Sequence, residues 1–198
     1  IEHINTRNET ARLDGIYNRA LRLMNEAKSE GDYEVAAKQF ASIKGYKNAE
    51  ELVQKCYAER KESIYSRSLK QMNAATREKE FKLAAYGFES IKGYKDSDEL
   101  AIKCREDAEI ARKNAIIAGA KQVALGGNVA AYERAIKMLA VFNDFDGVAE
   151  LIEEYENQIV IAKENEETQR RSNEYNRAVR CMSHDTLEGY NSAIEILN

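Results

Sequence analysis

The chain has 198 residues, 30 basic and 34 acidic side chains, a formal charge of −4 and no proline. The absence of proline permits long unbroken helices, because proline removes a backbone donor and disrupts helix interiors. Apolar and polar residues nowhere alternate over the length of a strand, which predicts an all-α fold. The two signs of charge are interspersed without a basic stripe, so the sequence argues against nucleic-acid binding.

No segment of the sequence is typical of a membrane protein or a secreted one. Apolar runs stay well below the roughly 18 residues of a spanning helix, and the start lacks a secretory signal. The isolated cysteines Cys56, Cys104 and Cys181 do not form a disulfide framework and favour a reducing, cytoplasmic compartment. Because the chain begins at Ile1 rather than at methionine, we expect it to be a piece of a larger polypeptide.

An internal repeat is the strongest feature of the sequence. The segment from Tyr33 reads YEVAAKQFASIKGYKNAEELVQKC, and the segment from Phe81, at an offset of 48, reads FKLAAYGFESIKGYKDSDELAIKC. A third copy from Tyr132 follows at an offset of 51, and we place its three extra residues at 126–128. A fourth copy begins at Tyr175 and ends in mid-hairpin. Such repeats bury a continuous core only by packing on their neighbours.

Each copy predicts a short helix followed by a long one. In the first copy, Tyr33, Ala36 and Phe40 recur at helical spacing. Asp32 is expected to cap the start of this helix. Gly45 is expected to end it in a left-handed conformation.

The long helices are expected to begin at capping boxes. Asn48 and Asp96 are each followed three residues later by glutamate, which is the capping-box pattern. We expect long helices near 5–29, 48–76, 96–125 and 147–184, and short helices near 32–44, 79–91, 129–143 and 187–198. The segment 163–173 is polar all round, and we expect it to continue the last long helix, with a hinge as the alternative.

These elements predict an all-α superhelix of tandem antiparallel helical hairpins with alternating long and short helices. We expect one helical-repeat domain over residues 1–198, with units near 14–62, 63–112, 113–172 and 173–198, the last truncated.

The pattern Tyr33-x-x-Ala36-x-x-x-Phe40 and its copy from Phe81 resemble the second helix of a tetratricopeptide repeat. The offset of 48 differs from that family's repeat of about 34 residues, and the closing proline is missing. Met24, Met72 and Val123 stand where the family prefers glycine. The string F-x-x-I-x-G-Y-K-D-S resembles the tetratricopeptide-like repeats of Gram-positive bacteria. The resemblance implies a superhelix that binds a protein or peptide partner.

Signatures of catalysis, cofactors and metals are missing from the sequence. His184 beside Asp185 lacks a recognisable nucleophile, and a surface histidine near a helix start is the simpler interpretation. Cys56 and Cys104 occupy equivalent positions on an apolar stripe, which favours core packing over a reactive thiol. No zinc motif and no phosphate-binding loop occurs, so we expect no enzyme, no cofactor and no metal.

One set of side chains is a candidate binding site. Asn25 and Asn73 are equivalent residues expected in mid-helix, where asparagine is unfavourable, and the basic Arg22 and Lys70 precede each by three residues. The family resemblance places these four positions on the concave groove. There, amide and basic side chains can hold a peptide carboxylate by charge-assisted hydrogen bonds. The alternative is that a duplicated gene copies its surface residues regardless of use.

Two functions from different classes follow. The first is a non-catalytic scaffold that binds a protein or peptide in the groove of the helical repeats. The second is a structural spacer or self-assembly domain within a larger polypeptide, which the polar segment 163–173 favours.

Overall fold

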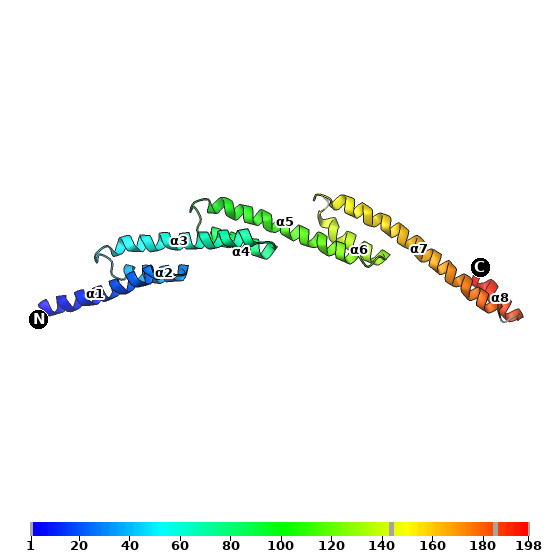
Figure 1. The fold of residues 1–198 in the computed structure, drawn as a ribbon, viewed down its shortest axis with the longest axis horizontal. Coiled ribbons are helices and arrows are strands. Elements are labelled where there is room, and N and C mark those ends of the chain that lie inside the picture. Colours follow the sequence, from blue (N-terminus) through cyan, green and yellow to red (C-terminus); the bar gives the residue numbers. More distant parts are fainter. Residues whose placement is uncertain (1, 143–144, 184–185, 198) are drawn as a thin grey trace. The chain divides into compact units, whose positions relative to one another are not determined.

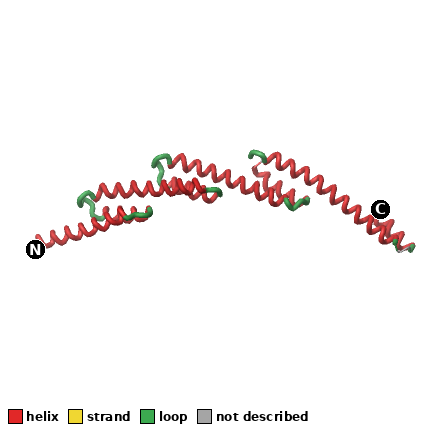
Figure 2. Tube along the Cα trace, in the orientation of Figure 1, coloured by secondary structure: helices red, strands yellow, loops and turns green. Residues whose placement is uncertain are grey.

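The fold was analysed in a computed structural model that describes residues 2–142, 145–183 and 186–197, with side chains from Arg7 onward. The described residues form helices and no strand, which confirms the all-α prediction (Figures 1 and 2). Their elements are α1 (Glu2–Asn25), α2 (Glu30–Ala41), α3 (Ala49–Ala74), α4 (Glu78–Glu89), α5 (Ser97–Ala124), α6 (Val129–Leu139), the 3-10 turn η1 (Ala140–Phe142), α7 (Val148–Met182) and α8 (Leu187–Leu197).

Long and short helices alternate as predicted, and their ends lie within a few residues of the expected positions. The chain divides into two compact units, Ile1–Arg112 and Lys113–Asn198. This division falls where the second repeat was expected to give way to the third. The predicted helix ends at 143 and 198, and the pair His184 and Asp185, lie outside the described residues.

The extra residues of the third copy lie mainly inside a helix, which corrects the prediction for 126–128. Helix α5 has 28 residues and α3 has 26. The turn that follows α5 spans 125–128, one residue longer than the turn 75–77 that follows α3. Added residues that continue a helix keep every backbone hydrogen bond, whereas a longer turn would not.

The cap of α2 is Ser29, so the prediction that Asp32 caps this helix was wrong. The Ser29 side chain accepts from the backbone N–H of Asp32, and the Asp32 carboxylate accepts from the backbone N–H of Ser29 at 2.9 Å. Asp32 is therefore the third helical residue of a capping box. Hydrogen bonds from the backbone of Lys28 and from Ser29 lower the pKa of the Asp32 carboxyl.

The turn into the next long helix has the left-handed backbone that was predicted. Gly45 and Gly93 have φ of 80° and 71°. Two residues later, Lys47 and Lys95 also have positive φ, of 49° and 50°. A left-handed conformation is uncommon for a residue with a β-carbon, so compensating contacts are expected around both lysines.

The predicted capping box at Asn48 does not form. Asn48 flanks the start of α3 but makes no capping hydrogen bond with its side chain. Its amide oxygen accepts instead from the hydroxyl of Tyr17 at 2.6 Å. The equivalent Asp96 accepts from the hydroxyl of Tyr65 at 2.7 Å. The side chains read as caps therefore join consecutive long helices.

In the first unit, each short helix packs against the long helices before and after it. Helix α2 packs on α1 and on α3 (Figure 1). Phe40 of α2 is fully buried in one cluster with Ala20 of α1 and Cys56 of α3. Phe88 of α4 is equally buried in a second cluster with Cys104 of α5. The repeat therefore places the same core residues in both copies.

Helices α3 and α4 approach each other closely at Gly87. Gly87 is buried against Ser68, whose hydroxyl donates to the carbonyl of Ile64 at 2.8 Å. A β-carbon at Gly87 would lie within 3.1 Å of the Ser68 β-carbon and closer still to its Oγ. In the first copy, Gln39 stands at the position of Gly87 and Ala20 at that of Ser68.

In the second unit, α7 packs against α6 and against α8. Leu139 of α6 and Val148 of α7 are buried together, and Ala178 of α7 and Ala193 of α8 are also buried. Helix α7 runs without interruption across 163–173, which confirms the expected continuous helix. All side chains of this segment are exposed except Glu167, which is half-buried.

Candidate functional site

The four predicted binding residues lie near the ends of two successive long helices, so the expectation that Asn25 and Asn73 are in mid-helix was wrong. Arg22 and Asn25 lie in the last turn of α1, and Lys70 and Asn73 lie near the end of α3. All four are exposed. Arg67, one turn before Lys70, pairs at 2.7 Å with Glu30 at the start of α2. Because Arg67 already lies beside the first residue of α2, Lys70 and Asn73, which follow Arg67 in α3, lie past the N-terminal end of α2.

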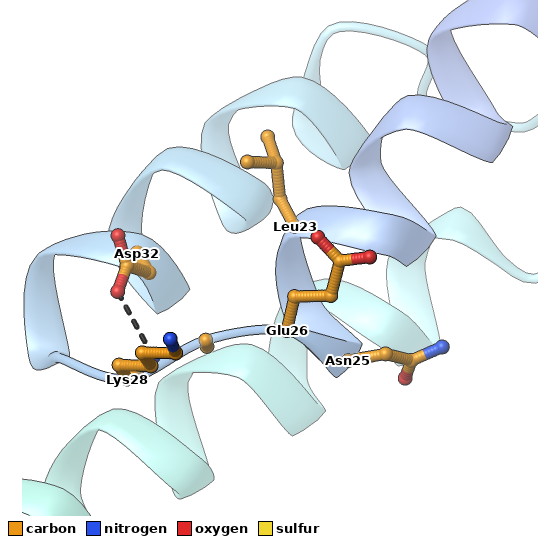
Figure 3. Close-up of a pocket in the computed structure, with 6 residues that line it drawn as sticks. Leu23, Asn25, Glu26, Lys28 and Asp32 are labelled. Carbon is orange, nitrogen blue, oxygen red and sulfur yellow. Dashed lines mark hydrogen bonds between the residues drawn. The ribbon is translucent and has the colours of Figure 1, made fainter.

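Asn25 borders a hollow of about 710 Å³ beside the turn between α1 and α2 (Figure 3). Leu23, Glu26, Lys28 and Asp32 line the same hollow. The Asn25 amide points away from Asp32 in Figure 3. The Asp32 carboxylate is occupied by its capping hydrogen bonds, so it offers little to a ligand.

The equivalent turn between α3 and α4 holds a smaller hollow of about 250 Å³. Glu80 lines it at the position of Asp32, and Ala75 at the position of Ala27. Glu80 accepts from the backbone N–H of Thr76 at 2.8 Å, which lowers the pKa of its carboxyl. The two hollows therefore result from the same capped turn in two copies of the repeat. Neither hollow is lined by all four predicted residues.

A third hollow, of about 420 Å³, lies within the second unit where α5, α6 and α7 meet. Lys121 lines it and stands 51 residues after Lys70, at the third-copy position of the predicted basic side chain. Ala124 takes the place of Asn73 there. Tyr132 and Tyr155 form its aromatic wall, with ring centroids 5.7 Å apart. Of the three hollows, this one combines a basic group with aromatic surface.

The sequence did not predict a charged aromatic cluster that lies at the turns before α3, α5 and α7. In the first copy, the Lys47 Nζ lies 2.5 Å from the Asp14 carboxylate and 4.7 Å from the centroid of Tyr17. Tyr46 flanks the same ammonium at 5.2 Å. The hydrogen bond from Lys47 lowers the pKa of the Asp14 carboxyl, and Asp14 raises the pKa of Lys47.

The second copy repeats this cluster at the equivalent positions, with Glu62 in the place of Asp14. Lys95 lies 2.5 Å from Glu62 and 4.5 Å from the centroid of Tyr65. Tyr94 donates to Glu62 at 2.7 Å. The hydrogen bonds from Lys95 and then from Tyr94 lower the pKa of the Glu62 carboxyl. Cation–π and ionic contacts of this kind offset the left-handed backbone of the lysine.

The third copy changes the source of the cation. Lys113 stands 48 residues after Tyr65, and its Nζ lies 5.0 Å from the centroid of Phe145. In this copy the ammonium group comes from α5 rather than from the turn before the next long helix. An acidic residue at 14 and 62 and a lysine at 47 and 95 were the sequence signals for the first two clusters. Because every polar group named in them is paired within the fold, the clusters are structural.

The thiols of Cys56 and Cys104 lie in the core, whereas the thiol of Cys181 is half-buried. Cys56 and Cys104 are free and buried, as predicted for core positions. Burial raises the pKa of both thiols, which disfavours the reactive thiolate. In the part of the chain that the structure describes, no three His, Cys, Asp or Glu side chains are placed to hold a metal ion. No helix of that part is long and apolar enough to cross a membrane.

Comparison with known proteins adds no relative to this picture. No protein-family model, no curated protein and no solved structure matches the chain. The tetratricopeptide-like resemblance therefore rests on the residues that carry it.

Proposed function

We propose that this chain is a non-catalytic structural module, a spacer in which long helices hold successive hairpins at fixed separations. The observation that carries this proposal is the course of α7. This helix is uninterrupted from Val148 to Met182, with α6 packed on it before the polar segment and α8 after it. At about 1.5 Å per residue, a helix of 35 residues is about 52 Å long.

The polar segment carries its own reinforcement. Glu167 pairs with Arg170 and with Arg171, each at 2.8 Å, and Arg170 reaches Glu174 at 3.3 Å. Pairs at these spacings stabilise a helix that lacks tertiary neighbours. Several exposed charges joined in one network contribute more than a single surface pair. These contacts favour a stiff connector over a hinge.

Segment replacement tests the spacer. Donor and acceptor dyes are placed at Glu133→Cys on α6 and Glu195→Cys on α8, in a Cys181→Ser background. Replacing 163–173 with Gly and Ser is expected to broaden and shorten the dye separation, because such linkers behave as random coils. An Ala, Glu and Lys segment of equal length is the matched control and should retain the separation. An unchanged separation with the Gly and Ser segment would contradict the spacer.

A second function, a peptide-binding scaffold, is favoured by the hollow of the second unit. Lys121 offers a charge to a carboxylate, and Tyr132 and Tyr155 offer aromatic surface. Aromatic and basic side chains in a partly apolar recess are typical of peptide recognition. A superhelical groove that includes Arg22, Asn25, Lys70 and Asn73 stays a prediction of the family resemblance.

Partner capture separates the two groove hypotheses. The wild-type chain is compared with a variant carrying Ala at Arg22, Asn25, Lys70 and Asn73, and with Lys121→Ala plus Tyr132→Ala. Loss of a defined partner from the fourfold variant alone would support the predicted groove. Loss from the Lys121 and Tyr132 variant alone would support the hollow of the second unit. Equal capture by all three chains would eliminate both sites.

A further inference from the structure

One contact, between a short helix and the start of the next long helix, occurs three times within the chain. It joins α2 to α3, α4 to α5 and α6 to α7. The short helix contributes a large apolar side chain that is fully buried each time, namely Phe40, Phe88 or Leu139. The long helix contributes a leucine followed four residues later by cysteine or tyrosine, as in Leu52 and Cys56. We call this repeated contact the junction.

Helix α8 carries the short-helix surface of a junction, and this surface is exposed. Helix α8 packs on α7, the long helix before it. Leu197 stands at the position of Phe40 and is 56% exposed, whereas Phe40 is fully buried. Ile194 stands at the position of Ala37 and is 58% exposed, whereas Ala37 is 1% exposed. The start of a long helix covers the equivalent surface in each of the three earlier copies.

Helix α1 carries the long-helix surface of a junction. It packs on α2, the short helix after it, as α3 packs on α4. Arg12 and Arg19 stand 48 residues before Arg60 and Arg67, which bind α2 by ion pairs across the first junction. Arg19 is exposed and has no ion pair within the part of the chain that the structure describes. Helix α1 therefore has the arginines that face a preceding short helix in α3.

The apolar positions of α1 match those of α3 in part. Ile4 stands at the position of Leu52 in the sequence. Ile16 is half-buried, whereas the equivalent isoleucine of α3 is buried. Asn8 is exposed and stands at the position of Cys56, so one polar residue replaces a core residue of the junction. This difference predicts a weaker contact than the three within the chain, because an amide is costly to bury.

We propose that α8 of one copy of this chain binds α1 of a second copy and forms a further junction between them. A second copy is the occupant that the structure indicates, because the chain carries both surfaces of a contact that it already makes three times. The two copies contribute different surfaces, so the contact is heterologous. The first copy keeps its α1 free and the second keeps its α8 free, and assembly can therefore continue beyond a dimer.

The charges of α8 complement those of α1 at the position of Lys38. In the first junction, Glu34 raises the pKa of Lys38, and the nearby Arg60 opposes this shift. Glu195 stands at the position of Lys38, and Arg12 stands at the position of Arg60. The proposed junction therefore places a carboxylate near a guanidinium where the first junction has two like charges.

A second complementary pair follows at the same edge. Glu188 precedes Glu195 by seven residues, and Arg19 follows Arg12 by seven. Because the two helices of a junction are antiparallel, Glu188 and Arg19 lie two turns further along. Arg12 already pairs with Glu9 of its own helix, so Arg19 is the freer partner. This association is independent of the spacer role, since it needs only α1 and α8 and would survive a flexible α7.

Sedimentation velocity of the full 198-residue chain tests the association. The apparent mass should rise with concentration from 22.5 kDa and pass twice that value. Ile194→Glu should weaken association by about tenfold or more, because it places a carboxylate in an apolar contact. Leu83→Glu on α4, at a position 56% exposed, is the matched control and should leave association unchanged. A chain that stays monomeric, or association unaffected by Ile194→Glu, overturns the proposal.

Mixing two variants tests the pairing of α8 with α1. Ile194→Glu blocks α8 and leaves α1 intact, whereas Asn8→Glu with Arg19→Glu blocks α1 and leaves α8 intact. Each variant alone should associate weakly, and an equimolar mixture should form a dimer that grows no further. Wild-type association by the α1 variant, or a mixture that associates no better than its components, overturns the pairing. Circular dichroism of each variant confirms that it remains helical.

Two further changes test the register. Glu188→Arg and Arg19→Glu should each weaken association, and the two together should restore it. Asn8→Leu should strengthen association severalfold, because it places an apolar side chain where the junctions within the chain have cysteine or tyrosine. Single exchanges without effect, a double exchange without recovery, or weaker association of Asn8→Leu would overturn this register.

Discussion

The middle of α3 and the middle of α7 show two ways to stabilise a long helix. In α3, Arg60 and Arg67 pair with Glu34 and Glu30 of α2, and Glu62 is bound by Lys95 from the turn after α4. In α7, the ion pairs of 163–173 join residues of the same helix. Helix α7 has 35 residues and α3 has 26. A longer helix extends beyond the helices that pack on it. Ion pairs between its own side chains must therefore stabilise the part that has no tertiary neighbours.

The largest effect of a substitution is expected in the packed region. Phe88→Ala removes a fully buried ring between α3, α4 and α5, and should lower the free energy of unfolding by about 3–5 kcal/mol. Phe40→Ala should lower the free energy of unfolding by a similar amount, because Phe40 is fully buried at the equivalent position of the first copy. Val160→Ala on the exposed face of α7 is the control and should change stability by less than about 0.5 kcal/mol. Urea unfolding measures the free energy of unfolding of all three variants. A loss for Val160→Ala as large as that for Phe88→Ala would contradict the difference between the packed region and α7.

A smaller effect is expected where α3 and α4 approach most closely. Gly87→Ala introduces a β-carbon against Ser68 and should destabilise the fold by about 1–3 kcal/mol. Ser68→Ala should relieve part of this loss by removing the Oγ. Gly15→Ala in α1 meets no neighbouring atom within 4 Å and should stabilise by about 0.5–1 kcal/mol. Thermal unfolding distinguishes the signs, and a stabilising Gly87→Ala would contradict the close approach.

The smallest effect concerns pH and the polar segment of α7. Hydrogen bonds from Arg170 and then Arg171 lower the pKa of Glu167 from 4.5 to about 2. A lowered pKa means that these ion pairs stabilise the helix fully above pH 4.5 and are lost as the pH falls towards 2. Helicity, measured by circular dichroism, should therefore decline across this interval.

Two substitutions separate this effect from general acid unfolding. Glu167→Gln should remove the pH-dependent part of the decline that the ion pairs cause. Glu166→Gln removes a charge one residue away and should leave that part intact. The prediction fails if the two variants respond to acid identically.

Much of the fold could be predicted from the sequence, because helical period and an exact repeat are local signals. The stripe of Phe40 and its copy Phe88, and the turn glycines Gly45 and Gly93, all take their predicted positions. Caps were less predictable, since the amide of Asn48 can serve either its own helix or a neighbour. The hydroxyl of Tyr17 donates to the oxygen of that amide, and this hydrogen bond depends on how α1 and α3 pack on α2.

The candidate site was harder to predict than the fold. Arg22 and Lys70 share a repeat position, but equivalence in sequence does not tell how far apart two helix ends lie. The repeated cluster of Lys47 and Lys95 was visible only as a spacing of acidic and basic residues. A partner for any of these surfaces depends on a molecule whose chemistry the sequence does not contain.

A distance measurement across α7 tests the spacer most directly. Spin labels at Glu153→Cys and Arg177→Cys, in a Cys181→Ser background, bracket the polar segment on exposed positions. Labelled chains are diluted with unlabelled ones, and the distance distribution is recorded by double electron–electron resonance. A stiff helix predicts one narrow distribution near about 36 Å, from a rise of about 1.5 Å per residue. A broad distribution extending to much shorter distances would show a hinge and contradict the spacer.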